Sequence, residues 1–147
     1  MTAIRQAEAA WEGDLTRGHG TVSAVSSRAF TDLPVSWAAR TESPGGRTSP
    51  EELLAAAHAA CFEMALSGAL ARGGTPPERL SVSAAVTFDK TDAGWRVVSS
   101  ALTVTGRVPG IDADGFRAAA EATRDGCPIS QALKGNVALS VDASLER

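Results

Sequence analysis

The sequence predicts an α+β protein with about six strands in antiparallel sheets, and three observations carry this prediction. Short segments with alternating polar and apolar residues are bounded by glycine-containing turns, as expected for antiparallel strands. One long segment, residues 50–71, is rich in Ala and Leu and contains no proline after its first residue. Strands and helices follow one another in blocks without a regular strand–helix alternation, which favours α+β over α/β.

The first third of the chain predicts three extended segments. Residues 7–11 and 20–26 flank a turn at 14–20 whose two glycines suit a hairpin. A third extended segment is predicted at 34–40, before a proline- and glycine-containing loop at 43–47.

The clearest helix signal follows this loop. Ser49 suits the N-cap, Pro50 the first helical position, and Glu52 the last position of a capping box. The body up to residue 71 is apolar around most of its circumference, so we expect a long central helix that is buried on several sides. Two glycines at 73–74 end it.

The second half of the chain predicts strands, then helices, then a final strand. Strands at 81–89 and 95–108 are joined by a turn at 91–94. A helix is predicted at 112–124, capped by Asp112 or Asp114 and stopped by Gly126. A helical turn at 129–133 and a strand at 136–141 complete the chain. Since no repeat or linker interrupts this order, we expect one domain, 1–147.

Composition and charge exclude several classes of protein. The net charge is -3 and no cluster of Lys and Arg occurs, which argues against nucleic-acid binding. No continuous run approaches the roughly 18 apolar residues of a membrane helix. The N-terminal residues lack the apolar region of a secretory signal, so we expect a cytoplasmic protein without a membrane partner. Two cysteines in such a protein are either inert core residues or redox residues.

The two cysteines differ in their setting. Cys61 lies in the middle of the long helix, where a free cysteine often only fills space. Cys127 directly precedes Pro128 at the start of a short helix, where backbone N–H groups stabilise a thiolate. Their spacing in the sequence does not show whether they meet.

The two histidines offer further chemistry. His19, His58 and the cysteines show none of the paired spacings of zinc sites, so no metal is expected. His58 precedes Cys61 by three residues and shares a helix face with it, which leaves a Cys–His hydrolase as an alternative. The other interpretation of His58 is a histidine packed beside the core.

Two strings of residues carry a family resemblance. The first runs from Thr48 through Ser-Pro-Glu-Glu-Leu to Ala-Cys-Phe at 60–62, and the second is Cys-Pro-Ile-Ser-Gln-Ala-Leu at 127–133. Both resemble signatures of the OsmC/Ohr family of hydroperoxide reductases, and matches at 11–14, 17–18, 20–23 and 108–112 extend the resemblance over nearly the whole chain. His-Ala-Ala-Cys at 58–61 is more similar to the OsmC branch than to the Gly-Tyr-Ser-Ala-Cys of Ohr.

The resemblance implies a site and a reaction. An organic hydroperoxide would oxidise Cys61 to a sulfenic acid, and Cys127 would close a disulfide with it. Arg40 matches the arginine that activates the thiol, with Arg17 as the reserve candidate, and Glu51 matches the acidic partner of that arginine. The resemblance further implies a role in oxidative-stress defence, no cofactor, a dithiol reductant such as dihydrolipoamide or a lipoylated protein, and an intertwined homodimer.

The length of the long helix bears on the dimer. Glu51 and Cys61 are ten residues apart in the sequence. Ten residues of helix span about 15 Å, a long reach for an arginine that is paired with Glu51. We therefore expect Arg40 and Glu51 of one subunit to serve Cys61 of the other.

Apolar residues near the cysteines are candidates for a substrate pocket, although each can equally be core. They are Phe62, Met64, Leu66, Ile129 and Leu133. Three other functions stay open on the sequence: a non-enzymatic thiol switch, the Cys–His hydrolase, and a structural or ligand-binding domain.

Overall fold

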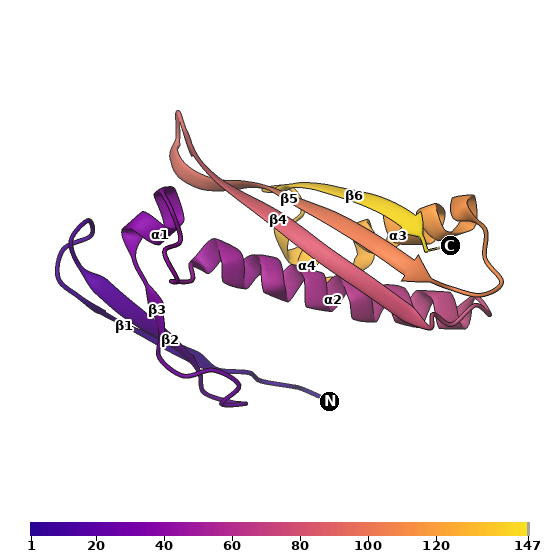
Figure 1. The fold of residues 1–147 in the computed structure, drawn as a ribbon, viewed down its shortest axis with the longest axis horizontal. Coiled ribbons are helices and arrows are strands. Elements are labelled where there is room, and N and C mark those ends of the chain that lie inside the picture. The colour runs from indigo at the N-terminus through magenta and orange to yellow at the C-terminus, as the bar shows by residue number, and fades with distance from the viewer. Residues whose placement is uncertain (147) are drawn as a thin grey trace. The chain divides into compact units, whose positions relative to one another are not determined.

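The chain forms four helices and six strands in residues 1–146, which are the residues that the structure, a computed structural model, describes (Figure 1). The chain divides into two compact units, Met1–Leu53 and Leu54–Arg147, and each contains one three-stranded sheet. This confirms the α+β class and the six strands. The single domain 1–147 stays a prediction, and its last residue lies outside the described ones.

The N-terminal unit is built on an antiparallel sheet in the order β1-β2-β3. Its strands are β1 (Ala7–Glu12), β2 (His19–Ala24) and β3 (Leu33–Val35). Gly20 is required where β2 crosses Trp11, because a Cβ atom there would lie 2.5 Å from the Ala10 carbonyl oxygen and 2.6 Å from the indole. Every residue of β1 is exposed, and no apolar side chain of residues 1–53 is buried.

The prediction of an extended segment at 34–40 is wrong beyond Val35. Helix α1 (Trp37–Thr41) occupies this stretch. Ser36 is its N-cap, and the Ser36 hydroxyl accepts a hydrogen bond from the Ala39 N–H at 3.1 Å. This local bond turns an alternating sequence into a helix.

Helix α2 (Pro50–Arg72) begins as predicted. The Glu52 N–H donates to the Ser49 hydroxyl at 3.1 Å. The Glu52 carboxylate accepts from the Thr48 hydroxyl at 2.7 Å, so it satisfies Thr48 and does not close the capping box.

Helix α2 buries less of its circumference than predicted. From residue 54 onward the buried positions are His58, Phe62, Leu66 and Leu70, a single stripe with a spacing of four. The alanine-rich remainder is exposed or half-buried in one chain. By length and mean hydropathy, α2 could also cross a membrane, contrary to the expectation above, but the core helix of a water-soluble protein meets the same two criteria.

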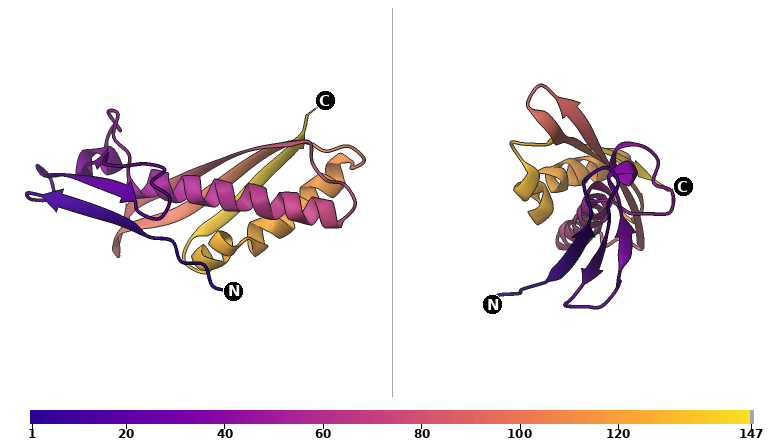
Figure 2. Two further views of the ribbon diagram at one scale, coloured as in Figure 1. Left: turned by 90° about the horizontal axis from the view of Figure 1, so that it is seen from below. Right: turned by 90° about the vertical axis from the view of Figure 1, so that its left-hand side faces the viewer.

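The C-terminal unit packs helices on one face of a sheet (Figure 2). The hairpin β4 (Arg79–Thr91) and β5 (Gly94–Arg107) is antiparallel. Helices α3 (Ala113–Gly126) and α4 (Pro128–Leu133) then lead to β6 (Ala138–Leu145). The core combines α2, β5 and α3 and consists of Phe62, Leu66, Leu70, Leu102, Val104, Val108, Phe116, Ala120 and Cys127.

The pairing of β6 differs from the prediction of antiparallel sheets. β6 runs parallel to β5, with Ser99 opposite Ala138 and Gly106 opposite Leu145. A parallel neighbour needs a long crossover, which α3 and α4 provide. Asp112 caps α3 as predicted, since its carboxylate accepts from the Gly115 N–H at 2.7 Å.

Candidate active site

An arginine is fixed by a carboxylate in the N-terminal unit. Arg40 lies in α1 and Glu51 in the first turn of α2. Arg40 Nε donates to Glu51 Oε1 at 3.0 Å, and Arg40 Nη2 donates to Oε2 at 2.9 Å. The guanidinium also lies 5.6 Å from the centroid of the Trp37 ring. The Arg40 side chain is 29% exposed against 10% for Glu51, so the charge is held rigidly while part of it still faces outward.

The reserve candidate, Arg17, has a different environment. It lies in the loop between β1 and β2, is 87% exposed, and pairs with Asp14 at 2.8 Å. The backbone and side chain of Arg17 both donate to the Asp14 carboxylate, and these bonds lower the pKa of Asp14. Because Glu51 is paired with Arg40, the structure brings together the first pair of predicted residues and not the reserve.

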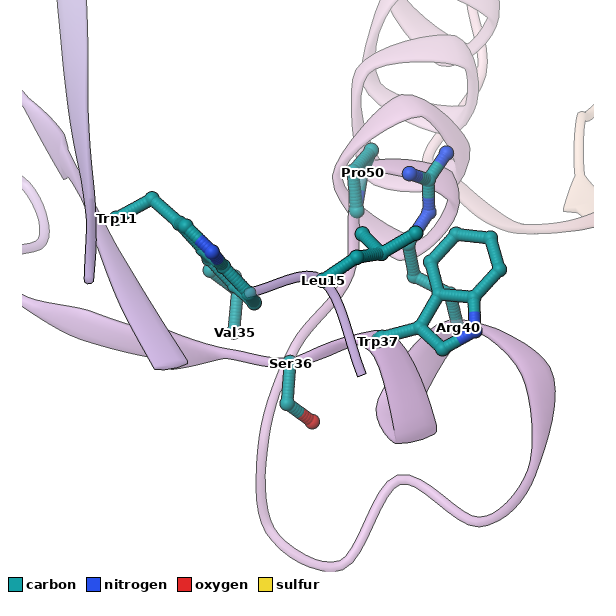
Figure 3. A pocket seen from close by; sticks show the side chains of 7 residues that line it. All are labelled: Trp11, Leu15, Val35, Ser36, Trp37, Arg40 and Pro50. Atoms are coloured by element: carbon teal, nitrogen blue, oxygen red, sulfur yellow. The ribbon is translucent and has the colours of Figure 1, made fainter. Parts of the chain in front are cut away.

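An apolar pocket of about 270 Å³ lies beside Arg40 (Figure 3). It is lined by Trp11, Leu15, Val35, Ser36, Trp37, Arg40 and Pro50. In Figure 3, Trp11 and Val35 form one wall, Trp37, Arg40 and Pro50 form the other, and Leu15 lies between them. Sequence reasoning missed this pocket. The sequence did contain a signal for it: the N-terminal part of the chain has large apolar side chains but too few other apolar residues to bury them.

The structure does not gather the predicted pocket residues into one cavity. Phe62 and Leu66 are fully buried in the core. Ile129 packs against that core and Leu133 is half-buried. Met64 is 68% exposed. Helical register explains the result, since Phe62 and Leu66 lie on the stripe that faces the sheet and Met64 does not.

Both cysteines are free thiols, and the C-terminal unit brings them together. Cys61 is half-buried in α2, and Cys127 is almost fully buried between α3 and α4. Burial raises the pKa of the Cys61 thiol; a backbone hydrogen bond at Ile129 opposes this shift, and the neighbouring Cys127 side chain adds to it. Residues far apart in the sequence thus meet at one site.

His58 is fully buried and has serine partners on both sides of its ring. Its Nδ1 lies 2.7 Å from the Ser100 hydroxyl, and its Nε2 lies 2.8 Å from the Ser130 hydroxyl. Burial lowers the pKa of His58. Because serines engage both nitrogens, the ring is not arranged to activate Cys61 in the way the hydrolase alternative requires.

Ser130 continues this chain to the second cysteine. Cys127 Sγ lies 3.1 Å from the Ser130 hydroxyl, and the Ser130 N–H donates to the sulfur at 3.3 Å. Sequence reasoning did not select Ser100 or Ser130, because a serine gives no sign in the sequence that it is buried. No group of three or more metal-ligating side chains occurs within residues 1–146.

Fold and site together define a two-cysteine α+β protein. The family model described as "OsmC-like protein" matches residues 43–142. The chain belongs to this OsmC-like family.

Relatives and solved structures agree with this assignment. The chain is 44% identical to "Peroxiredoxin OsmC" of Escherichia coli over 139 residues, which cover 95% of this chain and 96% of the relative. It is 31% identical to "Organic hydroperoxide resistance protein OhrA" of Bacillus subtilis over 66% of this chain and 67% of the relative. A putative organic hydroperoxide resistance protein from Vibrio cholerae has a similar structure, with a TM-score of 0.72 and 25% identity over 99% of this chain and 94% of the other.

Proposed function

We propose that this protein is a cysteine peroxidase that reduces organic hydroperoxides to alcohols in defence against oxidative stress. The approach of two free thiols, Cys61 and Cys127, is the observation that carries this proposal. The names of its relatives support it, since they include a peroxiredoxin and several organic hydroperoxide resistance proteins.

The chemistry takes two steps and a reduction. The Cys61 thiolate attacks the terminal oxygen of the hydroperoxide, the O–O bond breaks, and the alcohol leaves as Cys61 becomes a sulfenic acid. Cys127 then attacks the oxidised sulfur, so that a disulfide forms and water leaves. A dithiol, of which dihydrolipoamide or a lipoylated protein is the type we expect, reduces the disulfide and restores both thiols.

The first step needs a positive charge near Cys61. Burial raises the pKa of this thiol, and the neighbouring groups that shift it, the Ile129 backbone and the Cys127 side chain, are not cations. Arg40, held by Glu51, supplies the charge in this proposal and lowers the pKa of the thiol. The same guanidinium stabilises the charge that develops on the departing oxygen.

Two copies of the chain complete the site in this proposal. Ten residues of α2 separate Glu51 from Cys61, which corresponds to about 15 Å of helix. Arg40 and Glu51 of one subunit therefore serve Cys61 of a second. Two further observations support a homodimer: the N-terminal unit buries no apolar side chain, and α2 buries only one stripe.

The pocket beside Arg40 indicates the class of substrate. Five of its lining side chains are apolar: Trp11, Leu15, Val35, Trp37 and Pro50. Such walls favour alkyl or fatty-acid hydroperoxides over hydrogen peroxide, because burial of an alkyl group contributes about 0.8 kcal/mol per CH₂. The thiol chemistry and the dithiol reductant agree with a cytoplasmic location.

A subunit-mixing experiment tests the proposal. Cys61→Ser and Arg40→Ala proteins, each inactive or nearly so, are mixed under conditions that exchange subunits. A mixed dimer holds one intact pair of Cys61 and Arg40, so random exchange restores about a quarter of the wild-type sites in a C2 dimer. Cumene hydroperoxide consumption with a dithiol is the readout. No restored activity despite verified exchange, or a fully active wild-type monomer, would contradict the shared site.

A substrate comparison separates the peroxidase from a thiol switch. Stopped-flow oxidation of reduced protein should be faster with cumene hydroperoxide than with hydrogen peroxide. A peroxidase also turns over repeatedly with a dithiol. A switch would show one slow oxidation and no turnover.

A further inference from the structure

A continuous chain of hydrogen bonds runs through the interior of the C-terminal unit. It joins Ser100 of β5, His58 of α2, Ser130 of α4 and the sulfur of Cys127, with separations of 2.7, 2.8 and 3.1 Å in that order. All four side chains are at most 1% exposed. Polar groups this deep in an apolar core are costly and call for a reason. The attack of Cys61 on a peroxide does not use this chain.

The roles of the atoms set the direction of the chain in the reduced protein. The Ser130 N–H already donates to the sulfur of Cys127, so the S–H group is free to donate to the Ser130 hydroxyl. The hydroxyl proton of Ser130 then points to Nε2 of His58. Nε2 must accept, and the proton of the neutral ring lies on Nδ1, from which it reaches Ser100.

We propose that Ser130 and His58 form a proton relay that accepts the thiol proton of Cys127 when this residue attacks oxidised Cys61. The relay rests on the proposed peroxidase function, whose second step it serves. Ser130 contacts the reacting sulfur directly, whereas His58 acts through Ser130.

The step balances in atoms and electrons. The S–H proton of Cys127 passes to the Ser130 oxygen while the hydroxyl proton of Ser130 passes to Nε2 of His58. The thiolate of Cys127 attacks the sulfur of the Cys61 sulfenic acid, the S–S bond forms, and the S–OH bond breaks. Cys127 is oxidised and Cys61 is reduced. The departing hydroxide and the proton returned from His58 together make one water.

The surroundings of His58 suit a transient acceptor. Burial lowers its pKa, so the ring is neutral before the step and releases the proton readily afterwards. Cys61 and Cys127 are the other titratable side chains at this site. Every Asp, Glu, Lys and Arg of residues 54–146 is exposed or half-buried, so no fixed charge competes for the proton inside the core.

Two variants separate the relay from the peroxide step. Reduced protein is mixed with one equivalent of cumene hydroperoxide, and samples are quenched with a sulfenic-acid trap and an alkylating reagent for mass spectrometry. His58→Gln keeps a donor and an acceptor but cannot take the proton, and Ser130→Ala removes the link. Both should form sulfenic acid at nearly the wild-type rate and form the disulfide about tenfold to a hundredfold more slowly, as expected for lost general-base catalysis. Ser130→Thr, which keeps the hydroxyl, should recover most of the rate.

A matched control removes a hydroxyl close to Cys127 but outside the chain. The Thr123 hydroxyl donates to the Ala119 carbonyl at 2.8 Å, so Thr123→Val removes a part-buried hydrogen bond within α3. The Thr123→Val protein should form the disulfide at the wild-type rate. Equal slowing in Thr123→Val and His58→Gln would mean a loss of packing and would overturn the relay, as would wild-type closure in His58→Gln.

The pH dependence of disulfide closure distinguishes a relay from a structural effect. The wild-type rate should stay nearly flat above the ordinary histidine pKa of 6.5, where His58 is neutral. The His58→Gln rate should rise steadily with pH, because hydroxide in the solvent must then remove the thiol proton. Parallel profiles would count against the relay.

An NMR measurement judges the relay independently of peroxidase activity. In reduced, ¹⁵N-histidine-labelled protein, His58 should carry its proton on Nδ1 and leave Nε2 unprotonated, and Ser130→Ala should shift the Nε2 signal. A proton resident on Nε2 would refute the relay even if the peroxidase is real. If cumene hydroperoxide oxidises no thiol of the wild-type protein, the proposed function fails, and the NMR result alone decides the hydrogen-bond direction that the relay requires.

Discussion

The two units of the chain contrast in how they are held together. The C-terminal unit buries a continuous apolar core between its sheet and helices, and both cysteines lie in or beside that core. The N-terminal unit has a sheet of the same number of strands but buries no apolar side chain within residues 1–53. A three-stranded sheet that buries no apolar side chain is marginal in water.

This contrast separates two parts of the proposed chemistry. The thiols belong to the unit that supplies its own core, so their spacing is fixed by packing. Arg40 and the apolar pocket belong to the unit that needs another surface to cover it. In our proposal that surface is a second copy of the chain, and assembly brings the charge to the thiol.

Removal of the sulfur that attacks the peroxide in our proposal should have the largest effect. Cys61→Ser is expected to lower cumene hydroperoxide consumption to the background rate, because a hydroxyl is a far weaker nucleophile than a thiolate. The variant should keep the wild-type circular dichroism and dimer content. Residual turnover well above background would place the peroxidatic role elsewhere.

Removal of the second sulfur should have a different signature. Cys127→Ser is expected to consume about one equivalent of peroxide per chain and then stall, since no disulfide can form. Excess peroxide should then drive Cys61 to sulfinic acid, visible by mass spectrometry. Sustained turnover with a dithiol would show that resolution does not need Cys127.

The charge in the N-terminal unit should govern the rate of the first step. Arg40→Ala is expected to slow oxidation by cumene hydroperoxide about a hundredfold, comparable to the loss of one electrostatic contact to a transition state. The pKa of Cys61 should rise further, so the pH profile of the rate should move upward. Arg17→Ala is the control, since Arg17 is exposed and paired with Asp14. A slow Arg17→Ala protein beside a fast Arg40→Ala protein would reverse the assignment.

Truncation of one leucine in each unit should lower the free energy of unfolding by different amounts. Leu66→Ala leaves a cavity in the core of the C-terminal unit and should lower the free energy of unfolding by about 3 kcal/mol. Leu15 lines the pocket and is 57% exposed, so Leu15→Ala should lower the free energy of unfolding by less than about 1 kcal/mol. Leu15→Ala should instead slow cumene hydroperoxide more than hydrogen peroxide. Urea unfolding at fixed protein concentration and stopped-flow rates provide the two readouts.

The smallest effect concerns the pH dependence of stability. The folded-state pKa of His58 lies below its ordinary value of 6.5. The contribution of the buried, neutral ring to the free energy of unfolding is therefore fully present above pH 6.5 and is lost as the pH falls through the lowered pKa. The unfolded chain binds more protons in that range, and stability should therefore rise with pH. His58→Gln should show a flatter dependence below pH 6.5 in urea unfolding. An unchanged slope would mean that the buried ring does not titrate on unfolding.

The sequence predicts best what local chemistry decides. Ser49 and Asp112 cap their helices because a side-chain oxygen next to free N–H groups needs no tertiary partner. The same holds for the position of Cys127 before α4. The extended segment predicted at 34–40 was wrong beyond Val35 because the cap at Ser36 competed with an alternating pattern, and the pattern was the weaker signal.

Features that depend on distant residues were not accessible in this way. The parallel pairing of β6 depends on the path of α3 and α4 and not on the composition of the strand. The partners of His58 lie in β5 and α4, so its neighbours in the sequence do not reveal them. The pocket near Arg40 was missed because its lining residues are spread between Trp11 and Pro50 and do not neighbour either cysteine in the sequence.

Cys127 caps two helices at once, and this gives the oxidation state a structural readout. Its N–H donates to the Thr123 carbonyl at the end of α3, and its sulfur accepts from the Ser130 N–H at the start of α4. A sulfur drawn into a bond with Cys61 is a poorer acceptor for that amide. Hydrogen–deuterium exchange at Ser130 should therefore be faster in the disulfide form than in the dithiol form, so a single amide would report how far the protein has been oxidised.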